Sequence, residues 1–246
     1  QGDIGANELT GDTKEYELMT KDVDGISGTA TFAARKSGAA LVTVMLDGTP
    51  DGGMQPGHIH LNSAAESGGI AKTLTTLDGT TGMSVTHIEA LNDGTEIGYE
   101  GLLDFDGYIN FHLSADNLAT LVAQGDIGQN ELTGESMSYD LGTKDVPGIS
   151  GTATFEERLS GETLVTLDIE GTPVGGMHPA HIHAGAVADA PGDILITLAT
   201  VDGSLGMSQT HVAAYNAADG TANGGAAITY DELIGITKGS EKEITE

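Results

Sequence analysis

Short runs of alternating apolar and polar residues, separated by turn-forming residues, make up most of the chain. Such period-two alternation is typical of half-buried β-strands. Asp-Gly pairs that begin at Asp47, Asp78, Asp93, Asp106, Asp202 and Asp219 favour tight turns. In the first half of the chain the pattern predicts strands near residues 16–20, 26–33, 40–46, 57–61, 70–77, 84–91, 108–113 and 121–127, with short helical turns at 99–103 and after Ser114. Roughly eight strands per domain predict an all-β, Greek-key sandwich or barrel.

The same pattern occurs twice along the 246 residues. The segment QGDIGANELTG at 1–11 returns as QGDIGQNELTG at 124–134. KDVDGISGTATF returns as KDVPGISGTATF, and GGMQPGHIH returns as GGMHPAHIH. Self-similarity at a fixed spacing indicates repeated structural units. We therefore expect two tandem β-sandwiches.

The repeats need not coincide with the folded domains. The segment 106–134 runs without a break into the second QGDIG, so we expect a closing strand there and a first domain over 12–134. The second domain is expected over 135–236, without closing strands of its own, followed by an acidic tail over 237–246. Residues 1–11 are expected to be the closing strand of a preceding copy. Alternatively they complete the second sheet, within the chain or in a neighbouring molecule, which would make a homo-oligomer by strand exchange.

The amino-acid composition excludes several classes of binding partner and site. The 37 Asp and Glu residues against 9 Lys and Arg give a formal net charge of -28, which repels nucleic acids and anionic membranes. No apolar run is long enough to span a membrane, so we expect no membrane insertion. The absence of Cys excludes disulfides, thiolate metal sites and Cys nucleophiles. An acidic, Cys-free, Lys-poor chain favours a secreted, periplasmic or cell-surface protein of a saline habitat.

Histidine and methionine recur together in both copies. His58 and His60 flank Ile59, and side chains two apart share one face of a strand, so both imidazoles can bind one ion. A Met precedes each His cluster by four residues, as Met54 precedes His58. Imidazole with thioether, without carboxylate or thiolate, is a donor set that copper prefers.

These patterns predict one copper site, Cu(I) or Cu(II), in each domain. The first site is expected to use His58, His60 and His87, with His112, Met54 or Met83 as further ligands. The second is expected to use His181, His183 and His211, with His178, Met177 or Met207. The alternative is that the histidines are structural and the Met residues fill the core. Dense carboxylates make loosely bound calcium a further possibility, although no EF-hand loop is present.

Two passages carry a family resemblance. GTPDGGMQPGHIHLNSAAESGGIAKTL, followed by DGYINFHLSADNLATLVAQGDIG, resembles the chordin-like (CHRD) domain, whose hallmarks are a G-x-x-H-x-H-I-H-like strand and a later Y-V-N-V-H-like strand. The second copy, GTPVGGMHPAHIHAGA, fits the first hallmark more closely and lacks the second. CHRD domains look like relatives of the Cu,Zn superoxide dismutase sandwich. The resemblance implies extracytoplasmic, immunoglobulin-like Greek-key sandwiches, and it places His58, His60, His181 and His183 at the copper-ligand pair.

The function expected from these observations is an extracytoplasmic copper-binding module for sequestration or delivery. The alternative is a structural or adhesive surface repeat protein without metal chemistry. We do not expect an enzyme. No Asp and His cluster for a bridging zinc follows the H-I-H segment, and the net charge of -28 would repel superoxide, so the resemblance does not extend to dismutase activity.

Overall fold

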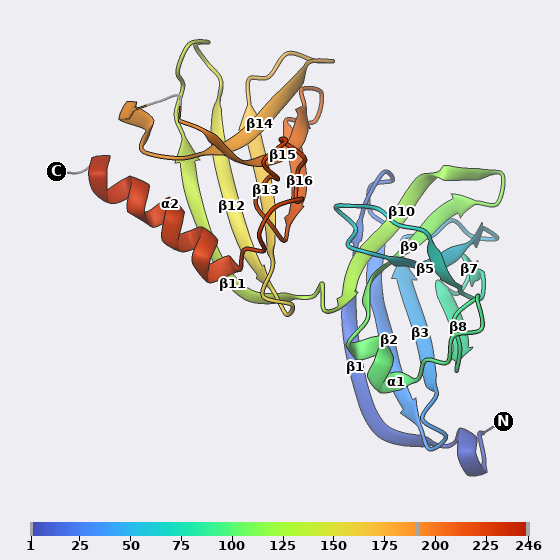
Figure 1. The fold of residues 1–246 in the computed structure, drawn as a ribbon. Helices are drawn as coiled ribbons and strands as arrows, with labels where there is room; N and C mark the ends of the chain where they lie inside the picture. Colours follow the sequence, from blue (N-terminus) through green and yellow to red (C-terminus); the bar gives the residue numbers. More distant parts are fainter. Residues whose placement is uncertain (1, 190–191, 245–246) are drawn as a thin grey trace. The chain divides into compact units, whose positions relative to one another are not determined.

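The computed structural model describes residues 2–189 and 192–244, which form two compact units, Gln1–Glu131 and Leu132–Glu246. Almost all regular structure is antiparallel β-sheet, with ten strands in the first unit and six in the second (Figure 1). The all-β class predicted from the alternation is confirmed. No helix among the described residues is long and apolar enough to cross a membrane.

Residues 54–55 form a strand that was not predicted, and residues 70–77 form two short strands in place of the single predicted one. Every other predicted range overlaps one of the ten strands of the first unit. These strands are β1 (Leu9–Thr20), β2 (Ser27–Arg35), β3 (Ala40–Asp47), β4 (Met54–Gln55), β5 (Gly57–Leu61), β6 (Ile70–Thr73), β7 (Leu77–Asp78), β8 (Met83–Ile88), β9 (Asp106–Ser114) and β10 (Asn117–Gly128). A 3-10 turn, η1 (Gly5–Asn7), precedes β1, and a short helix, α1 (Tyr99–Leu103), precedes β9. The helical turn expected after Ser114 is wrong, because Ser114 pairs with Asn117 in the hairpin between β9 and β10.

The strands of the first unit are ordered β4-β7-β8-β3-β2-β1-β10-β9-β5-β6. Strand β1 belongs to both halves of this sheet: its residues from Leu9 to Leu18 pair with β2, and Met19 and Thr20 pair with β10. The two halves enclose an apolar core that includes Phe32, Ile59, Ile109 and Phe111, each fully buried. Helix α1 adds the buried side chains of Tyr99 and Leu102 to this core. The result is a sandwich in which β5 and β9 are neighbours.

The N-terminal segment lies against its own unit. The backbone N–H groups of Lys36 and Ser37 donate to the carbonyls of Glu8 and Ala6, and Leu9 pairs with Arg35. This differs from the expectation that residues 1–11 close another sheet. In the second copy of the repeated segment, the QGDIG residues end β10, and Gly128 turns the chain with φ of 60°. The ELTG residues that follow begin the next strand, which is β11 here and β1 in the first copy.

The second unit has fewer strands than the first. Its strands are β11 (Leu132–Leu141), β12 (Ser150–Arg158), β13 (Thr163–Glu170), β14 (Met177–His183), β15 (Ile194–Asp202) and β16 (Met207–Val212), in the order β11-β12-β13-β16-β15-β14. A 3-10 turn, η2 (Val187–Asp189), follows β14. Because the sheet order ends at β14, the strand that carries the second H-I-H segment is an edge strand.

Helix α2 (Tyr230–Ile244) follows the last strand of the second unit. It packs against β12 (Figure 1). The Tyr139 hydroxyl of β11 lies 2.7 Å from Oγ1 of Thr237. Leu233 is fully buried in the second core. Residues 237–244, which were expected to belong to an acidic tail, continue this helix to Ile244.

Candidate metal centre

The H-I-H segment of the first unit forms β5, with its side chains alternating as predicted. Ile59 is fully buried and faces Ile109 across the β5–β9 pair, so it points into the core. His58 pairs with Asn110 and His60 pairs with Tyr108, on the opposite face. This alternation sets two imidazoles side by side on the outer face of the sheet.

Strand β9 supplies the third imidazole. His112 lies two residues beyond Asn110, the partner of His58, and is therefore the diagonal neighbour of His58 on the same face. Nδ1 of His58 lies 3.3 Å from Nε2 of His112. One ring nitrogen from each of His58, His60 and His112 lies within 4.8 Å of the other two. These three imidazoles are placed so that they can hold a metal ion.

Backbone carbonyls orient two of the rings. Nδ1 of His60 lies 2.9 Å from the carbonyl oxygen of Gly68, and Nδ1 of His112 lies 2.7 Å from that of Leu118. A carbonyl can only accept, so each Nδ1 carries the proton and each Nε2 keeps its lone pair. Nε2 of His60 is buried and, among the described residues, has no hydrogen-bond partner. A metal ion in the cluster would satisfy this atom, which makes the site fit a metal.

The surroundings lower the pKa of two of the three imidazoles. Burial, followed by the neighbouring His112 and His60, lowers the pKa of His58 from 6.5 to about 4. Burial also lowers the pKa of His112. A neutral imidazole is the form that binds metals, since protonation removes the lone pair. His58 and His112 are therefore in the form that binds metals at neutral pH.

Two neighbouring side chains were not anticipated from the sequence. The ring of Tyr108 stacks on that of His60 with centroids 4.8 Å apart and planes at 17°. Asn110 is buried beside His58, and its Oδ1 has no hydrogen-bond partner in the described part of the chain. The signal was present in the sequence, because Tyr108, Asn110 and His112 alternate in YINFH and so share a face.

The other candidate ligands of the first unit lie elsewhere. His87 is on the outer face of β8, where it pairs with Leu41 of β3, and its Nε2 lies 3.5 Å from a carboxylate oxygen of Glu89. Met54 and Met83 are both exposed. Each is opposite Asp78, on β4 and β8, in the half of the sheet that does not contain β5. The third imidazole grouped with His58 and His60 is thus His112 and not His87.

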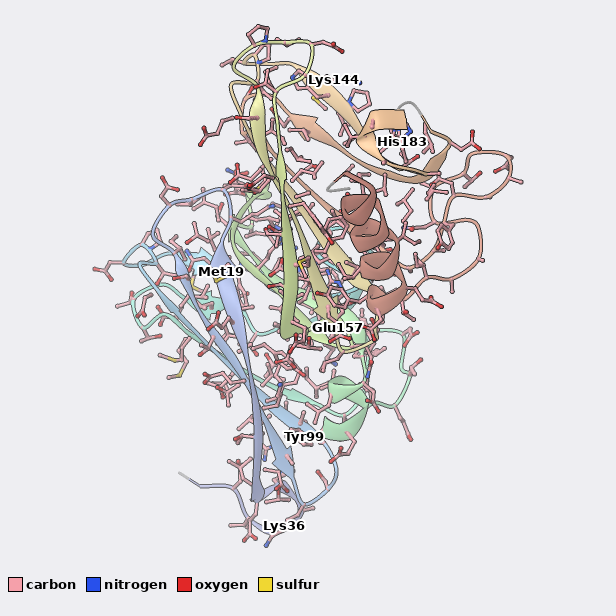
Figure 2. The ribbon with its side chains drawn as sticks, turned by 90° about the vertical axis from the view of Figure 1, so that its left-hand side faces the viewer. Met19, Lys36, Tyr99, Lys144, Glu157 and His183 are labelled. Carbon is pink, nitrogen blue, oxygen red and sulfur yellow. The ribbon has the colours of Figure 1, made fainter. Side chains whose placement is uncertain are left out.

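The second unit repeats only part of this arrangement. His181 and His183 are exposed on β14, with ring centroids 5.8 Å apart. Nδ1 of His183 donates to the carbonyl of Gly192 over 2.8 Å, matching the bond from His60 to Gly68. The side chain of His183, which is labelled in Figure 2, is exposed. No third imidazole joins this pair within residues 2–189 and 192–244, so the predicted second site stays a prediction.

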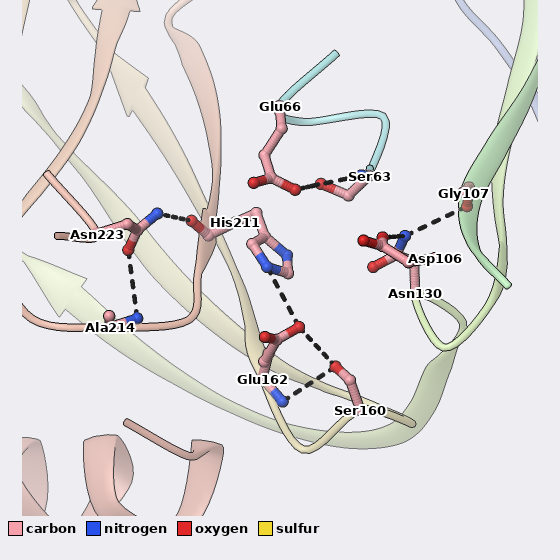
Figure 3. Close-up of polar contacts among 10 residues, drawn as sticks. All are labelled: Ser63, Glu66, Asp106, Gly107, Asn130, Ser160, Glu162, His211, Ala214 and Asn223. Atoms are coloured by element: carbon pink, nitrogen blue, oxygen red, sulfur yellow. Dashed lines mark hydrogen bonds and ion pairs between the residues drawn. The ribbon is translucent and has the colours of Figure 1, made fainter. Parts of the chain in front are cut away.

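The remaining candidates of the second unit are separated from that pair. His211 is buried on β16, and its Nε2 lies 3.3 Å from a Glu162 carboxylate oxygen, which also accepts from the Ser160 hydroxyl (Figure 3). His178 is half-buried, on the opposite face of β14 from His181. Met177 and Met207 are exposed, and both are opposite Asp202.

Comparison with known proteins does not assign the chain to a family. No family model matches the chain, and neither a curated protein nor a solved structure matches it. The functional argument therefore depends on the geometry of the His cluster.

Proposed function

We propose that the first unit is a copper-binding module that holds one copper ion for sequestration or delivery. The observation that carries the proposal is the convergence of His58, His60 and His112 on one face of the β5–β9 pair. His60 and His112 would bind through Nε2, because a backbone carbonyl holds the proton on each Nδ1. Bound copper would supply a redox-active, imidazole-ligated cation.

The donor set supports copper over other metals. Nitrogen ligands bind divalent first-row metals with an affinity that peaks at copper, and imidazole is among the ligands that suit it. The three grouped residues are all histidines and include no carboxylate. Zn(II) also accepts imidazole, so the proposal is that copper outcompetes zinc at this site.

An extracytoplasmic location and a relationship to CHRD domains form part of the proposal. They are supported by the HIH and YINFH segments, by the absence of Cys and by the net charge of -28. We propose binding and not turnover. The net charge of -28 would repel superoxide and would not guide it to the metal.

Native mass spectrometry during titration with Cu(I), Cu(II) and Zn(II) tests the proposal. A His58→Ala, His60→Ala, His112→Ala variant should lose the tightest copper equivalent, and zinc should not displace copper from the parent chain. A His87→Ala variant is the matched control, because His87 is exposed and lies in the other half of the sheet. Equal copper uptake by the parent and the triple variant would contradict the proposal, and so would displacement of copper by zinc.

A second candidate is a structural or adhesive repeat in which the histidines serve only the fold. The second unit favours it, because its sheet is intact although no third imidazole joins His181 and His183 among the described residues. Under this alternative the triple variant would be less stable than the parent chain, and added copper would not raise the melting temperature of either protein.

A further inference from the structure

The edge strand of the second unit exposes the same ligand pair that the first unit covers. In the first unit, β9 pairs with β5 and brings His112 to His58. In the second unit, β14 stands at the end of the strand order among the described residues. In the described part of the chain, no strand pairs with β14 on the side where β9 pairs with β5 in the first unit.

The side of β14 opposite β15 presents backbone groups that can pair with another strand. The N–H of Ala184 donates to Asp193, as Leu61 donates to Gly69 in the first unit, so residues 182 and 184 direct their backbone groups toward β15. Successive residues of a strand direct these groups to opposite sides. The N–H and C=O groups of His181 and His183 therefore face the side opposite β15, as those of His58 and His60 face β9. Pro179, which has no N–H to donate, interrupts this edge only before the H-I-H segment.

We infer that β14 pairs antiparallel with β14 of a second copy of this chain, and that the pairing builds a copper site shared between the two copies. This inference rests on the proposed copper chemistry. With Ile182 opposite its own counterpart, His181 of one copy is opposite His183 of the other. The backbone groups of His181 and His183 then meet their counterparts across the two-fold axis, which is the requirement of a self-complementary interface.

The same register gathers four imidazoles on one face. Directly opposite residues in an antiparallel pair have Cβ atoms about 4.5–5.5 Å apart, and diagonal ones about 7–8 Å. The first unit shows that such a diagonal brings two imidazole nitrogens to 3.3 Å, between His58 and His112. Two exposed pairs of His181 and His183 thus supply the ligands for one four-coordinate ion. The imidazoles of the second copy would complete the set of ligands, as His112 does in the first unit.

Charge makes the association depend on the metal. Each chain carries a formal charge of -28, so two metal-free copies repel one another. A cation bound by four neutral imidazoles offsets that repulsion where the two edges meet. The pair should therefore form with copper and separate when copper is removed.

Sedimentation velocity of the full chain with and without Cu(I) tests the inference, together with copper content per chain. The parent chain should be monomeric in EDTA and dimeric with copper, holding three ions for each pair of chains. The His181→Ala, His183→Ala variant should stay monomeric and keep one ion per chain. The His58→Ala, His60→Ala variant should still dimerise, with one ion for each pair. These two variants separate failure of the shared site from failure of the proposed first site.

Hydrogen exchange supplies a second readout. Copper should slow exchange of the His181 and His183 amides in the parent chain, because both would become hydrogen-bonded across the interface. Simple chelation by the two side chains of one copy would leave these amides fast. A monomeric parent chain in the presence of copper, equal dimerisation in EDTA, or a copper-dependent dimer of the His181→Ala, His183→Ala variant would overturn the inference.

Discussion

Nδ1 of His58 lies 3.3 Å from Nε2 of His112, although the two residues are 54 positions apart in the sequence. The register between β5 and β9 makes this contact, since Asn110 is opposite His58 and His112 follows on the same face. The sandwich thus assembles a His cluster from two strands that are neighbours only in the folded sheet.

The contribution of His112 can be measured directly. His112→Ala should weaken copper binding by at least about tenfold, because it removes one of three converging imidazoles. His87→Ala should leave the affinity unchanged. Competition titration against a chromogenic Cu(I) chelator measures both variants. If His87→Ala weakened binding and His112→Ala did not, the site would have to be rebuilt around β8.

The carbonyl of Gly68 orients His60, and the backbone at Gly68 leaves no room for a side chain. A Cβ at Gly68 would collide with the Leu61 carbonyl, whereas one at Gly69 would meet nothing within 4 Å. Gly68→Ala should displace the loop, loosen His60 and lower copper affinity by about 10–100-fold. Gly69→Ala is the matched control and should bind as the parent does. Equal affinities for the two variants would show that the bond to Gly68 does not matter for the metal.

The metal-free protein should lose stability in mild acid. The folded state holds the pKa of His58 at about 4, below its ordinary value of 6.5. The unfolded chain therefore takes up a proton first, and the stabilisation present above about pH 6.5 is lost as the pH falls toward about 4. Urea unfolding of the parent chain and of His58→Asn across this range measures the effect. The variant should show a weaker dependence on pH, and parallel curves would refute this assignment.

Helix α2 should contribute to the stability of the second unit. Leu233 is fully buried between the helix and the sheet, so Leu233→Ala should cost about 2–5 kcal/mol. Gly235→Ala, on an exposed turn of the same helix with nothing within 4 Å, should stabilise the protein by up to about 1 kcal/mol. Circular dichroism during urea unfolding measures both changes. Unaltered stability of Leu233→Ala would mean that the helix does not complete this core.

Local patterns in the sequence were sufficient to predict the fold class and most strands of the first unit. The period-two alternation located most of the strands of the first unit, and the spacing of His58 and His60 correctly put both on one face. Such features depend on neighbouring residues alone. The all-β class followed from them.

Long-range pairing decided what local patterns could not. The local pattern does not show whether His87 or His112 lies near His58 and His60. Only the order of strands shows that β9 lies beside β5, while β8 lies beside β3. The extent of α2 was missed although a signal for it was present. Thr229 and Glu232 form a capping box, in which the Thr229 N–H donates to the Glu232 carboxylate and the Glu232 N–H donates to the Thr229 hydroxyl.

X-ray absorption spectroscopy of the copper-loaded His181→Ala, His183→Ala variant tests the central claim most directly, because that variant leaves the first unit as the proposed site. The account predicts one bound ion per chain, with a first shell of three nitrogens and the multiple scattering of imidazole rings. A shell of oxygen or sulfur without imidazole scattering, or a variant that retains no copper, would contradict it.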